Sequence, residues 1–380
     1  MLSSSVSVSD KMKLFRIQVH SFRNISRADL SLSDRFNIIF GDNAQGKTNL
    51  LEAVYLLGTM KSFRMAKNSE LIAYESGYSN VKGWVTRDGV ERNISLSITN
   101  TGKKAAIDGK PVIRPTDFFG NLNMVVFSPE DISMVRGLPE VRRRYLDRAV
   151  FSIDTGYLGL HHDYFRILRN RNALLKQGIS DGLSVWTEKL ADSGARLMEK
   201  RISLVHKMDE LLREFYAAIA GKSHEARIFY RSRCVDPGNP SLNLRRQLHQ
   251  ALEQAFKDEL RRGTTLAGPH RDDLEFSLNG KPLNHHGSQG EQRTFILALK
   301  MSEIESMKCR WKNPPVLLLD DMTSELDRGR NGNFINFLKE KDMQVFLTTT
   351  SLDNIDLSEI SSYSTFPVQE GRISNEVENV

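Results

Sequence analysis

The 380-residue sequence is poor in cysteine and has no long apolar run. Its two cysteines, Cys234 and Cys309, are far apart and belong to no Cys-x-x-Cys pattern, so we expect free thiols in a reduced, cytoplasmic setting. The first residues, MLSSSVSVSDKMK, lack the apolar segment of a secretion signal; we expect 1–12 to be a disordered lead, and Met12 would serve equally well as the start. No apolar stretch approaches the length that crosses a bilayer, which predicts a soluble protein without a membrane partner.

Positive charge is in modest excess. Lysine and arginine total 53 and aspartate and glutamate 47, which gives a formal charge of +6 and an isoelectric point near 9.2. A basic surface gathers phosphates, so a polyanionic partner is favoured, although many basic proteins bind no nucleic acid. The hydrophobic share of 39% is typical of a globular chain and supplies a core for one large or two ordinary domains.

Hydrophobic periodicity predicts α/β structure at the start of the chain. Residues 13–22 and 28–33 alternate apolar and polar side chains, as half-exposed strands do, whereas FNIIF at 36–40 is typical of a strand buried on both faces. Residues 48–58 have helical spacing. From Val81 to Val112, short alternating segments are broken by Asp-Gly and Thr-Gly pairs, which predict an antiparallel meander.

The middle of the chain has helical character. Residues 141–219 are rich in Leu, Arg, Lys and Glu and contain no proline. The segment 186–220 predicts one long amphipathic helix, too short for an extended coiled-coil arm. A loop at 233–241 precedes another predicted helix at 242–262. We therefore expect a packed helical lobe at 139–262.

Strand patterns return after this lobe. One short strand is predicted before the lobe, at 124–127. After the lobe, strands are predicted at 274–278, 316–320 and 343–349, and a helix is predicted at 289–308. The sequence therefore predicts an α/β ATPase lobe made of residues 13–138 and 263–380, into which the helical lobe is inserted.

GDNAQGKT at Gly41–Thr48 fits the GxxxxGK[ST] pattern between a predicted buried strand and a predicted helix, and these flanking elements disfavour a chance match. Glycines let the backbone fold around phosphates, and the helix N-terminus adds the positive end of a dipole. We expect Lys47 to reach the β- and γ-phosphates of ATP and the Thr48 hydroxyl to bind Mg2+. The predicted nucleotide-binding residues here are Gly41, Asp42, Asn43, Ala44, Gln45, Gly46, Lys47, Thr48 and Asn49.

Two acids follow the buried strand in PPVLLLDDMTSELD. Asp320 is expected at the carboxyl edge of the sheet, where open α/β sheets bind ligands, and is our candidate for the acidic Mg2+ partner. Asp321 is our candidate for the base that polarises the attacking water. Asp320, Asp321 and Lys47 form the predicted catalytic set.

A third element, HGSQGEQRT, comes shortly before that strand. It resembles the signature motif of ABC-type ATPases, with Ser288, Gly290 and Gln292 at the expected positions. The start of such a helix can present N–H groups and a serine to a γ-phosphate. An ordinary helix cap is the alternative in isolation, but SELD at 324–327 resembles the D-loop that follows in ABC proteins.

The interval from Lys47 to Asp320 is too long for a nucleotide kinase. The layout resembles the ATPase heads of SMC-like proteins. The predicted fold is therefore an ABC-type phosphate-loop ATPase head of the α/β class, with an antiparallel meander and an inserted helical lobe but without a long coiled coil. Within that group the chain from about Leu14 onward resembles the RecF family of bacterial recombination mediators. The matching segments are FRN (22–24), GKTNLLEAVYLLG (46–58), KSFR (61–64), FSPED (127–131), GLPEVRRRYLD (137–147), GPHRDDL (268–274), GSQGEQRT (287–294) and LLLDDMTSELD (317–327).

This resemblance implies an ATP- and Mg2+-binding, DNA-dependent weak ATPase in DNA repair, replication, recombination and the SOS response. It implies RecR and RecO as partners in loading recombinase on gapped duplex DNA. In an ABC head the signature serine completes the site of a second copy. We therefore expect an ATP-dependent homodimer in which Ser288 contacts the γ-phosphate at Lys47 of the other chain, with DNA across the closed pair.

Slow turnover is expected from two departures from transporter-type ABC proteins. Asp321 stands where these proteins have a longer glutamate, and Thr348, Thr349 and Thr350 stand where they carry a switch histidine. A base of shorter reach without an imidazole positions water less well, although the aspartate and a threonine could do the same work adequately.

Basic residues near the motifs are candidate phosphate contacts on DNA. Lys61 and Arg64 follow the first helix, and Arg142, Arg143 and Arg144 form a compact run beside the helical lobe. For the arginine run, a solvated helix face is nearly as good an interpretation.

Four further positions depart from a pattern or leave their role open. Ala44 stands where the related phosphate loops have a glycine, which tolerates positive φ, so tightening of the loop or some loss of affinity is expected. Arg271 is either a functional contact or the partner of Asp272 or Asp273. His285 and His286 lack companion ligands, so we assign no metal there.

Two other functions are alternatives to a DNA-repair clamp. A nucleotide-binding subunit of another ABC system, such as a transporter, would need a switch histidine and a membrane-coupling surface, and the meander and Thr350 argue against it. A non-catalytic module that uses nucleotide as a structural ligand is disfavoured because Lys47 and Asp320 are intact.

Overall fold

A computed structural model describes residues 12–221, 224–235, 243–321, 328–355, 360 and 362–374. Contacts divide the chain into two compact units. The first comprises residues 1–131, 217–223 and 293–380, and the second comprises 132–216 and 224–292. Of the predicted disordered lead at 1–12, residues 1–11 lie outside the described residues, as does the D-loop-like segment at 324–327. Met12 contradicts that prediction, because it is 2% exposed and packs in the hydrophobic core.

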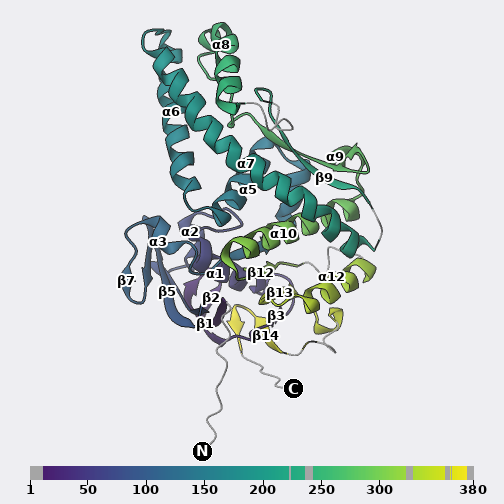
Figure 1. The fold of residues 1–380 in the computed structure, drawn as a ribbon. Coiled ribbons are helices and arrows are strands. Elements are labelled where there is room, and N and C mark those ends of the chain that lie inside the picture. The colour runs from purple at the N-terminus through teal and green to yellow at the C-terminus, as the bar shows by residue number, and fades with distance from the viewer. Residues whose placement is uncertain are drawn as a thin grey trace, which may run out of the picture. The chain divides into compact units, whose positions relative to one another are not determined.

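The first unit contains two six-stranded sheets and their helices (Figure 1). Its elements are β1 (Lys13–Phe22), β2 (Ile25–Ser31), β3 (Phe36–Phe40), α1 (Lys47–Thr59), α2 (Asn68–Leu71), β4 (Tyr78–Arg87), β5 (Val90–Thr99), β6 (Gly102–Ile107), β7 (Lys110–Pro111), α3 (Pro115–Phe118), β8 (Met124–Phe127), β12 (Val316–Leu319), α12 (Arg328–Glu340), β13 (Val345–Thr349), the 3-10 helix η2 (Leu352–Asn354), β14 (Tyr363–Gln369) and β15 (Arg372–Ile373). The predicted meander is confirmed as part of the antiparallel sheet β2-β1-β4-β5-β6-β7.

The second sheet has the order β15-β14-β3-β13-β12-β8, and its five strands from β14 to β8 are parallel. The strands β12 and β13 are buried along their whole length, as their continuous apolar sequences predict. Because the strands are parallel, the carboxyl ends of β3 and β12 lie at one edge of the sheet. This edge receives the phosphate loop after β3 and the two acids after β12.

Helix α1 packs against strands of both sheets and is buried on nearly every side. Its leucines Leu50, Leu51, Leu56 and Leu57 are each at most 2% exposed, and burial of each contributes about 2 kcal/mol. Gly58 packs against the segment just before β8, and a Cβ at this position would lie 2.5 Å from the Leu122 carbonyl oxygen. The helix that begins at the phosphate loop is therefore fixed in the core of the first unit.

The second unit is built around three long helices and a small sheet. Its elements are α4 (Ser133–Arg136), α5 (Pro139–Ile153), α6 (Tyr157–Gln177), α7 (Leu183–Ala220), β9 (Ala226–Arg231), α8 (Leu244–Arg262), β10 (Asp273–Leu278), β11 (Lys281–Pro282) and α9 (Leu283–His286). The 3-10 helix η1 (Pro129–Ile132), the end of α7 and helix α10 (Gln289–Trp311) continue across the boundary between the units. Buried Arg171 of α6 donates to Thr187 of α7 at 3.0 Å and pairs with Glu259 of α8 at 2.6 Å, which holds these helices side by side (Figure 1).

The observed units differ from the predicted domain bounds at residues 132–138 and 217–223, and most extensively at residues 263–292. We predicted this segment as part of the ATPase lobe, but β10 pairs antiparallel with β9, whose strand pattern we had not recognised. The segment with GPHRDDL and the signature motif thus groups with the helical part. Strand β14, which no sequence pattern predicts, pairs with β3 beside the phosphate loop.

Among the described residues, no helix combines the length and the hydrophobicity that a membrane span requires.

Candidate nucleotide-binding site

The loop from Gly41 to Thr48 connects β3 to α1 and adopts a backbone that needs glycine at two points. Gly41 has φ 143° and Gly46 has φ 119°, which side chains rarely adopt. A Cβ at Gly46 would also lie 2.8 Å from Oδ1 of Asn24. These two positions let the loop wrap closely at the start of α1, where N–H groups and the helix dipole favour an anion.

Two hairpin turns brace this loop through Gln45. Asn24, in the β1–β2 turn, donates to the Gln45 carbonyl at 2.9 Å, and Gly371, in the β14–β15 turn, donates to the same carbonyl at 2.9 Å. The Gln45 side-chain oxygen accepts from the backbone N–H of Glu370 at 2.6 Å. The Gln45 side chain therefore supports the loop instead of lining the cavity, a role that the loop pattern alone did not reveal.

Lys47 is 7% exposed and lies under the loop. Its Nζ donates to the carbonyl oxygens of Gly41 at 2.6 Å and Asp42 at 2.7 Å. Burial lowers the pKa of Lys47, and the nearby carboxylates of Asp321, Asp320 and Asp42 oppose that shift. A buried ammonium that donates to two neutral carbonyls is well placed to bind an anion.

Thr48 and Asp320 meet as the motifs predict. The Thr48 hydroxyl donates to Oδ1 of Asp320 at 2.8 Å, and the Thr348 hydroxyl donates to the same oxygen at 3.0 Å. Asp320 is 4% exposed, and burial raises its pKa, with the two hydroxyls acting in the opposite direction. A cation would offset this burial cost, so the hydroxyl and carboxylate pair fits Mg2+, which is bound by few protein oxygens together with phosphates.

Asp321 is held in an unusual backbone conformation. Its φ is 49°, in the left-handed region, and its backbone N–H donates to the Thr348 hydroxyl at 2.7 Å. Strain of this kind costs about 1 kcal/mol and persists where neighbouring contacts enforce it. Thr348 thus fixes both acids, and no motif in the sequence had assigned it that role.

These groups surround a cavity of about 360 Å3 in the first unit. It is lined by Arg23, Asn43, Ala44, Gly46, Lys47, Thr48, Asn49, Arg64, Asp321 and Thr348. The structure therefore brings together most of the predicted loop residues with one acid, and adds Arg23 and Thr348. Arg23 lies in the FRN segment, which signalled family resemblance but not a site.

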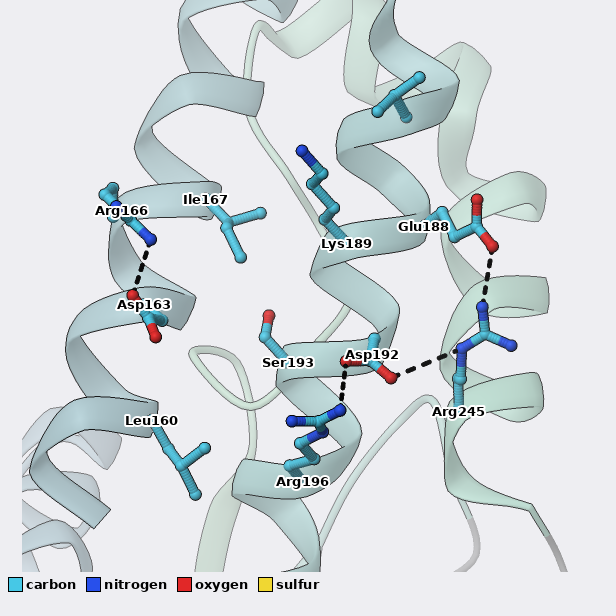
Figure 2. Close-up of a pocket in the computed structure, with 11 residues that line it drawn as sticks. Leu160, Asp163, Arg166, Ile167, Glu188, Lys189, Asp192, Ser193, Arg196 and Arg245 are labelled. Carbon is cyan, nitrogen blue, oxygen red and sulfur yellow. Dashed lines mark hydrogen bonds and ion pairs between the residues drawn. The ribbon is translucent and has the colours of Figure 1, made fainter. Parts of the chain in front are cut away.

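A second cavity, of about 440 Å3, lies in the second unit between α6, α7 and α8 (Figure 2). Its charges are largely paired within the wall: Arg166 with Asp163 at 2.7 Å, and Arg245 with Glu188 at 2.9 Å. Arg196 is paired with Asp192 at 3.2 Å. Its three arginines are therefore engaged by carboxylates, whereas Lys189 lies over the Trp186 ring at 5.4 Å, and the cavity has no phosphate loop.

Ala44 adopts φ 65°, the left-handed conformation that glycine accepts without strain. We expect Ala44→Gly to raise the free energy of unfolding by about 0.5 kcal/mol, since relief of about 1 kcal/mol of strain exceeds the added freedom of the unfolded chain. Urea denaturation of both proteins measures this change. A decrease of about 0.5 kcal/mol or more would show that Ala44 is not strained.

The signature residues lie in the second unit at the start of α10. The exposed Ser288 donates from both its N–H and its hydroxyl to Oε2 of Glu291, each at 2.8 Å, which forms a helix cap. Gln292 is 4% exposed; it donates to the Gly287 carbonyl at 2.9 Å and accepts from Arg136 at 2.7 Å. Ser288 and the half-buried Gly290 can face a ligand, whereas Gln292 holds the turn in place.

Comparison with known proteins places these motifs in one family. The chain matches the family described as RecF/RecN/SMC N terminal domain over residues 13–374. It is 55% identical over 362 residues to the DNA replication and repair protein RecF of Geotalea uraniireducens, covering 95% of this chain and 100% of that protein. It belongs to the RecF family.

Other relatives agree with this assignment. The RecF of Geobacter sulfurreducens is 50% identical over 363 residues, with 96% of this chain and 100% of that protein covered. A solved structure described as the recombination mediator protein RecF-ATP in the RecFOR pathway has a TM-score of 0.86 at 33% identity, covering 96% of this chain and 99% of that one. An Smc head domain from Pyrococcus furiosus, at 15% identity and a TM-score of 0.57 with 96% of each chain covered, shares the fold. The predicted SMC-like ATPase head is confirmed.

Within this RecF-family fold, the predicted DNA contacts have different surroundings. Lys61 and Arg64 are exposed, and Arg64 lines the nucleotide cavity. Arg142 is instead tied down by Asp273 through two hydrogen bonds of 2.7 and 2.8 Å, and Arg143 donates to the Asp272 carbonyl at 2.9 Å.

The structure therefore corrects the interpretation of the arginine run. Arg142 and Arg143 hold α5 against β10, because their guanidinium groups are occupied by acceptors of the same unit. Arg144 is exposed and pairs with Glu140 at 3.2 Å, as expected for a solvated helix face. Arg271 is exposed and donates to the Thr265 carbonyl at 3.3 Å. In the described part of the chain, no group of three or more His, Cys, Asp or Glu side chains is arranged to hold a metal ion. His285 and His286 are therefore not part of such a group.

Asp272 and His270, in the GPHRDDL segment, are buried groups with opposite titration behaviour. Burial raises the pKa of Asp272 to about 6 and lowers that of His270 to about 4. Asp272 therefore adds stability below about pH 3.8 that is lost as the pH rises through 6, whereas the His270 contribution is present above about pH 6.5 and is lost as the pH falls through 4.

We expect Asp272→Asn to change the pH dependence of stability. The amide keeps the oxygen that accepts from the Tyr230 hydroxyl at 2.5 Å but removes the buried charge. Relative to the unmodified chain, its free energy of unfolding is expected to rise by about 2.4 kcal/mol between pH 4 and pH 7. Denaturant titrations at both pH values measure this, and a parallel pH dependence in the two proteins would contradict it.

Proposed function

We propose that this chain is a cytoplasmic, ATP-dependent DNA-binding protein of recombinational repair and replication restart. The cavity lined by Lys47 and Thr48, with Asp320 accepting from the Thr48 hydroxyl, carries the nucleotide part of this proposal. The similarity to RecF proteins over nearly the whole chain supports the repair part. A transporter subunit is not supported by any feature of the described residues.

ATP would be held by the backbone and side chains of the loop from Gly41 to Asn49. Lys47 would leave the Gly41 and Asp42 carbonyls to donate to the β- and γ-phosphates, an exchange of neutral for anionic acceptors. Thr48 and Asp320 would bind Mg2+, which supplies charge neutralisation at the phosphates when bound. The cation would thereby offset the cost of burying the Asp320 carboxylate, which raises its pKa.

Hydrolysis to ADP and phosphate would be slow. Asp321 accepts the proton of the attacking water in this proposal, and Thr348 fixes its backbone through the 2.7 Å hydrogen bond. The short carboxylate reaches less far than a glutamate, and Thr348 cannot supply the charge of a histidine. ATP then acts as a timed clamp, and turnover of tens per second by the purified protein alone would contradict this.

Two copies of the chain would close on one another when ATP binds. Ser288 is exposed, and its hydroxyl bonds to Glu291 of its own chain. Ser288 can exchange that acceptor for the γ-phosphate at the partner's Lys47, with Gly290 giving close backbone approach. Gln292, fixed by Arg136, would position this turn without contacting the nucleotide.

Duplex DNA at single-strand gaps would bind the closed pair, and RecR and RecO would be its partners in loading recombinase. Lys61 and Arg64 are the favoured phosphate contacts, since both are exposed; Arg144 is a weaker candidate because Glu140 neutralises it. Such contacts give affinity that falls with salt and depends little on sequence.

The direct test is binding of labelled duplex DNA by the purified protein with ATP, with ADP and without nucleotide. ATP is expected to raise the affinity at least about tenfold over ADP in roughly 0.1 M salt. Lys47→Arg should abolish this difference and leave the weak nucleotide-free binding intact. Equal DNA affinity in all three conditions would refute the proposed function.

A further inference from the structure

One face of α1 carries the loop that follows the helix. Asn49, Glu52 and Tyr55 are spaced by three residues and so lie on the same face. Asn49 accepts from Arg64 at 3.3 Å, Glu52 accepts from Ser62, and the Tyr55 ring meets that of Phe63 edge-on at 5.6 Å. The segment 61–66 is thus attached along the helix that starts at the phosphate loop.

Glu52 is the central member of this face and is fully buried, with 0% of its side chain exposed. It pairs with Arg23, whose Nη2 donates to Oε1 at 3.1 Å and whose Nε donates to Oε2. The Ser62 hydroxyl donates to the same carboxylate, and Ser62 Oγ accepts from the Ala66 N–H at 3.1 Å. A buried carboxylate is tolerated only when it is paired and hydrogen-bonded in this way.

The two segments joined by Glu52 both reach the nucleotide cavity. Arg23 comes from the β1–β2 turn and Arg64 from the loop after α1, and each lines the cavity wall. Arg23 is 17% exposed, so its guanidinium is held by Glu52 at the edge of the cavity rather than extended into solvent. The cavity therefore has two cations whose positions depend on one buried carboxylate.

We propose that Glu52 is a positioning residue that ties Arg23 and the loop 61–66 to α1 as one rigid body, so that nucleotide in the cavity orders this basic loop. A ligand that engages Arg23 or Arg64 stabilises the position of both segments, and the coupling is reciprocal. This inference rests on the proposed ATP binding. It adds the route by which the nucleotide would change the exposed surface that carries Lys61 and Arg64.

A purely structural role for Glu52 makes a different prediction. If the pair only stabilised the fold, its removal would lower the melting temperature without changing how nucleotide affects the loop. If Glu52 positions the loop, the effect of nucleotide on the loop disappears even in variants that remain folded.

The test is limited trypsin digestion with and without a non-hydrolysable ATP analogue and Mg2+, since trypsin cuts after the exposed Lys61 and Arg64. All proteins carry Ser288→Ala, so that dimer formation does not contribute to protection. The digestion contains no DNA. With Glu52 intact, the analogue is expected to slow cleavage at these two sites about tenfold. Glu52→Gln and Ser62→Ala should reduce that protection below about twofold, and Glu52→Gln should also weaken binding of the analogue about tenfold.

The matched control is Glu70→Gln in α2, which removes an exposed carboxylate that accepts from the Lys67 N–H at 2.7 Å. It should leave both protection and affinity within about twofold. If Glu52→Gln fails to fold, Ser62→Ala still gives the result, because it retains the Arg23–Glu52 pair. Tenfold protection in folded Glu52→Gln or in Ser62→Ala would overturn the inference. Absence of analogue binding to the protein with Glu52 intact would instead overturn the proposed function.

Discussion

Replacing Lys47 by alanine is expected to lower the affinity for ATP at least about a hundredfold while leaving the folded state intact. The lysine is 7% exposed, and its ammonium donates to the carbonyls of Gly41 and Asp42. A charge-assisted contact to phosphate is worth roughly 3 kcal/mol, which corresponds to that factor. Isothermal titration calorimetry with Mg2+ and ATP measures it directly.

Stability should respond differently from affinity in this variant. Burial lowers the pKa of Lys47, so the charged form is partly disfavoured where it lies, and its removal relieves that cost. We expect the melting temperature to stay within about 3 °C. Lys13→Ala in β1, which removes a half-buried lysine that pairs with the exposed Asp34, is the matched control and should leave ATP affinity unchanged. An ATP affinity within tenfold of the original in Lys47→Ala would contradict our assignment.

Replacing Ser288 by alanine is expected to abolish the ATP-dependent dimer while ATP still binds each chain. Ser288 belongs to the second unit, and Lys47 belongs to the first. If the two complete a site across copies, Ser288→Ala and Lys47→Ala each fail alone. A mixture of the two variants regains dimer, because one of its two shared sites has both residues. Native mass spectrometry with ATP distinguishes the single variants from the mixture.

Ser193→Ala is the matched control for this experiment. Ser193 lies in α7 of the same unit and donates to the Leu190 carbonyl at 3.3 Å, away from the signature turn. It should dimerise with ATP as the unmodified chain does. Our proposal would be wrong if Ser288→Ala dimerised normally or if the mixture stayed monomeric.

The local motifs were predictable because their geometry is encoded in adjacent residues. The run FNIIF-GDNAQGKT-NLLEA specifies a buried strand, a tight loop and a helix, and the structure has all three. The meeting of Thr48 with Asp320 also followed, because the carboxyl ends of parallel strands share one edge. Ala44 was singled out from the pattern, and its φ of 65° shows why a glycine is favoured there.

Features that depend on pairing between distant segments could not be read from the sequence. The brace of Gln45 by Asn24 and Gly371 joins three separate turns, and none of them has a pattern that names the others. Strand β14 was missed because its register is set by contact with β3 and because Pro367 interrupts a strand pattern.

Charge runs were the least informative sequence feature. Three adjacent arginines looked equivalent, but helix geometry directs Arg142 and Arg143 toward acceptors near β10 and leaves Arg144 at the surface. Glu52 presents the opposite case. In the sequence it is one acidic residue within the family-like segment 46–58. Only the structure shows that its side chain is fully buried between Arg23 and Ser62.

The central claim is that binding ATP and pairing two copies of the chain are one event. Sedimentation velocity of the purified protein with Mg2+ and either ATP or ADP tests it most directly. We predict a species of twice the 43.2 kDa chain mass with ATP and a monomer with ADP. The same monomer mass in both nucleotides, under conditions where calorimetry shows ATP bound, would contradict the claim.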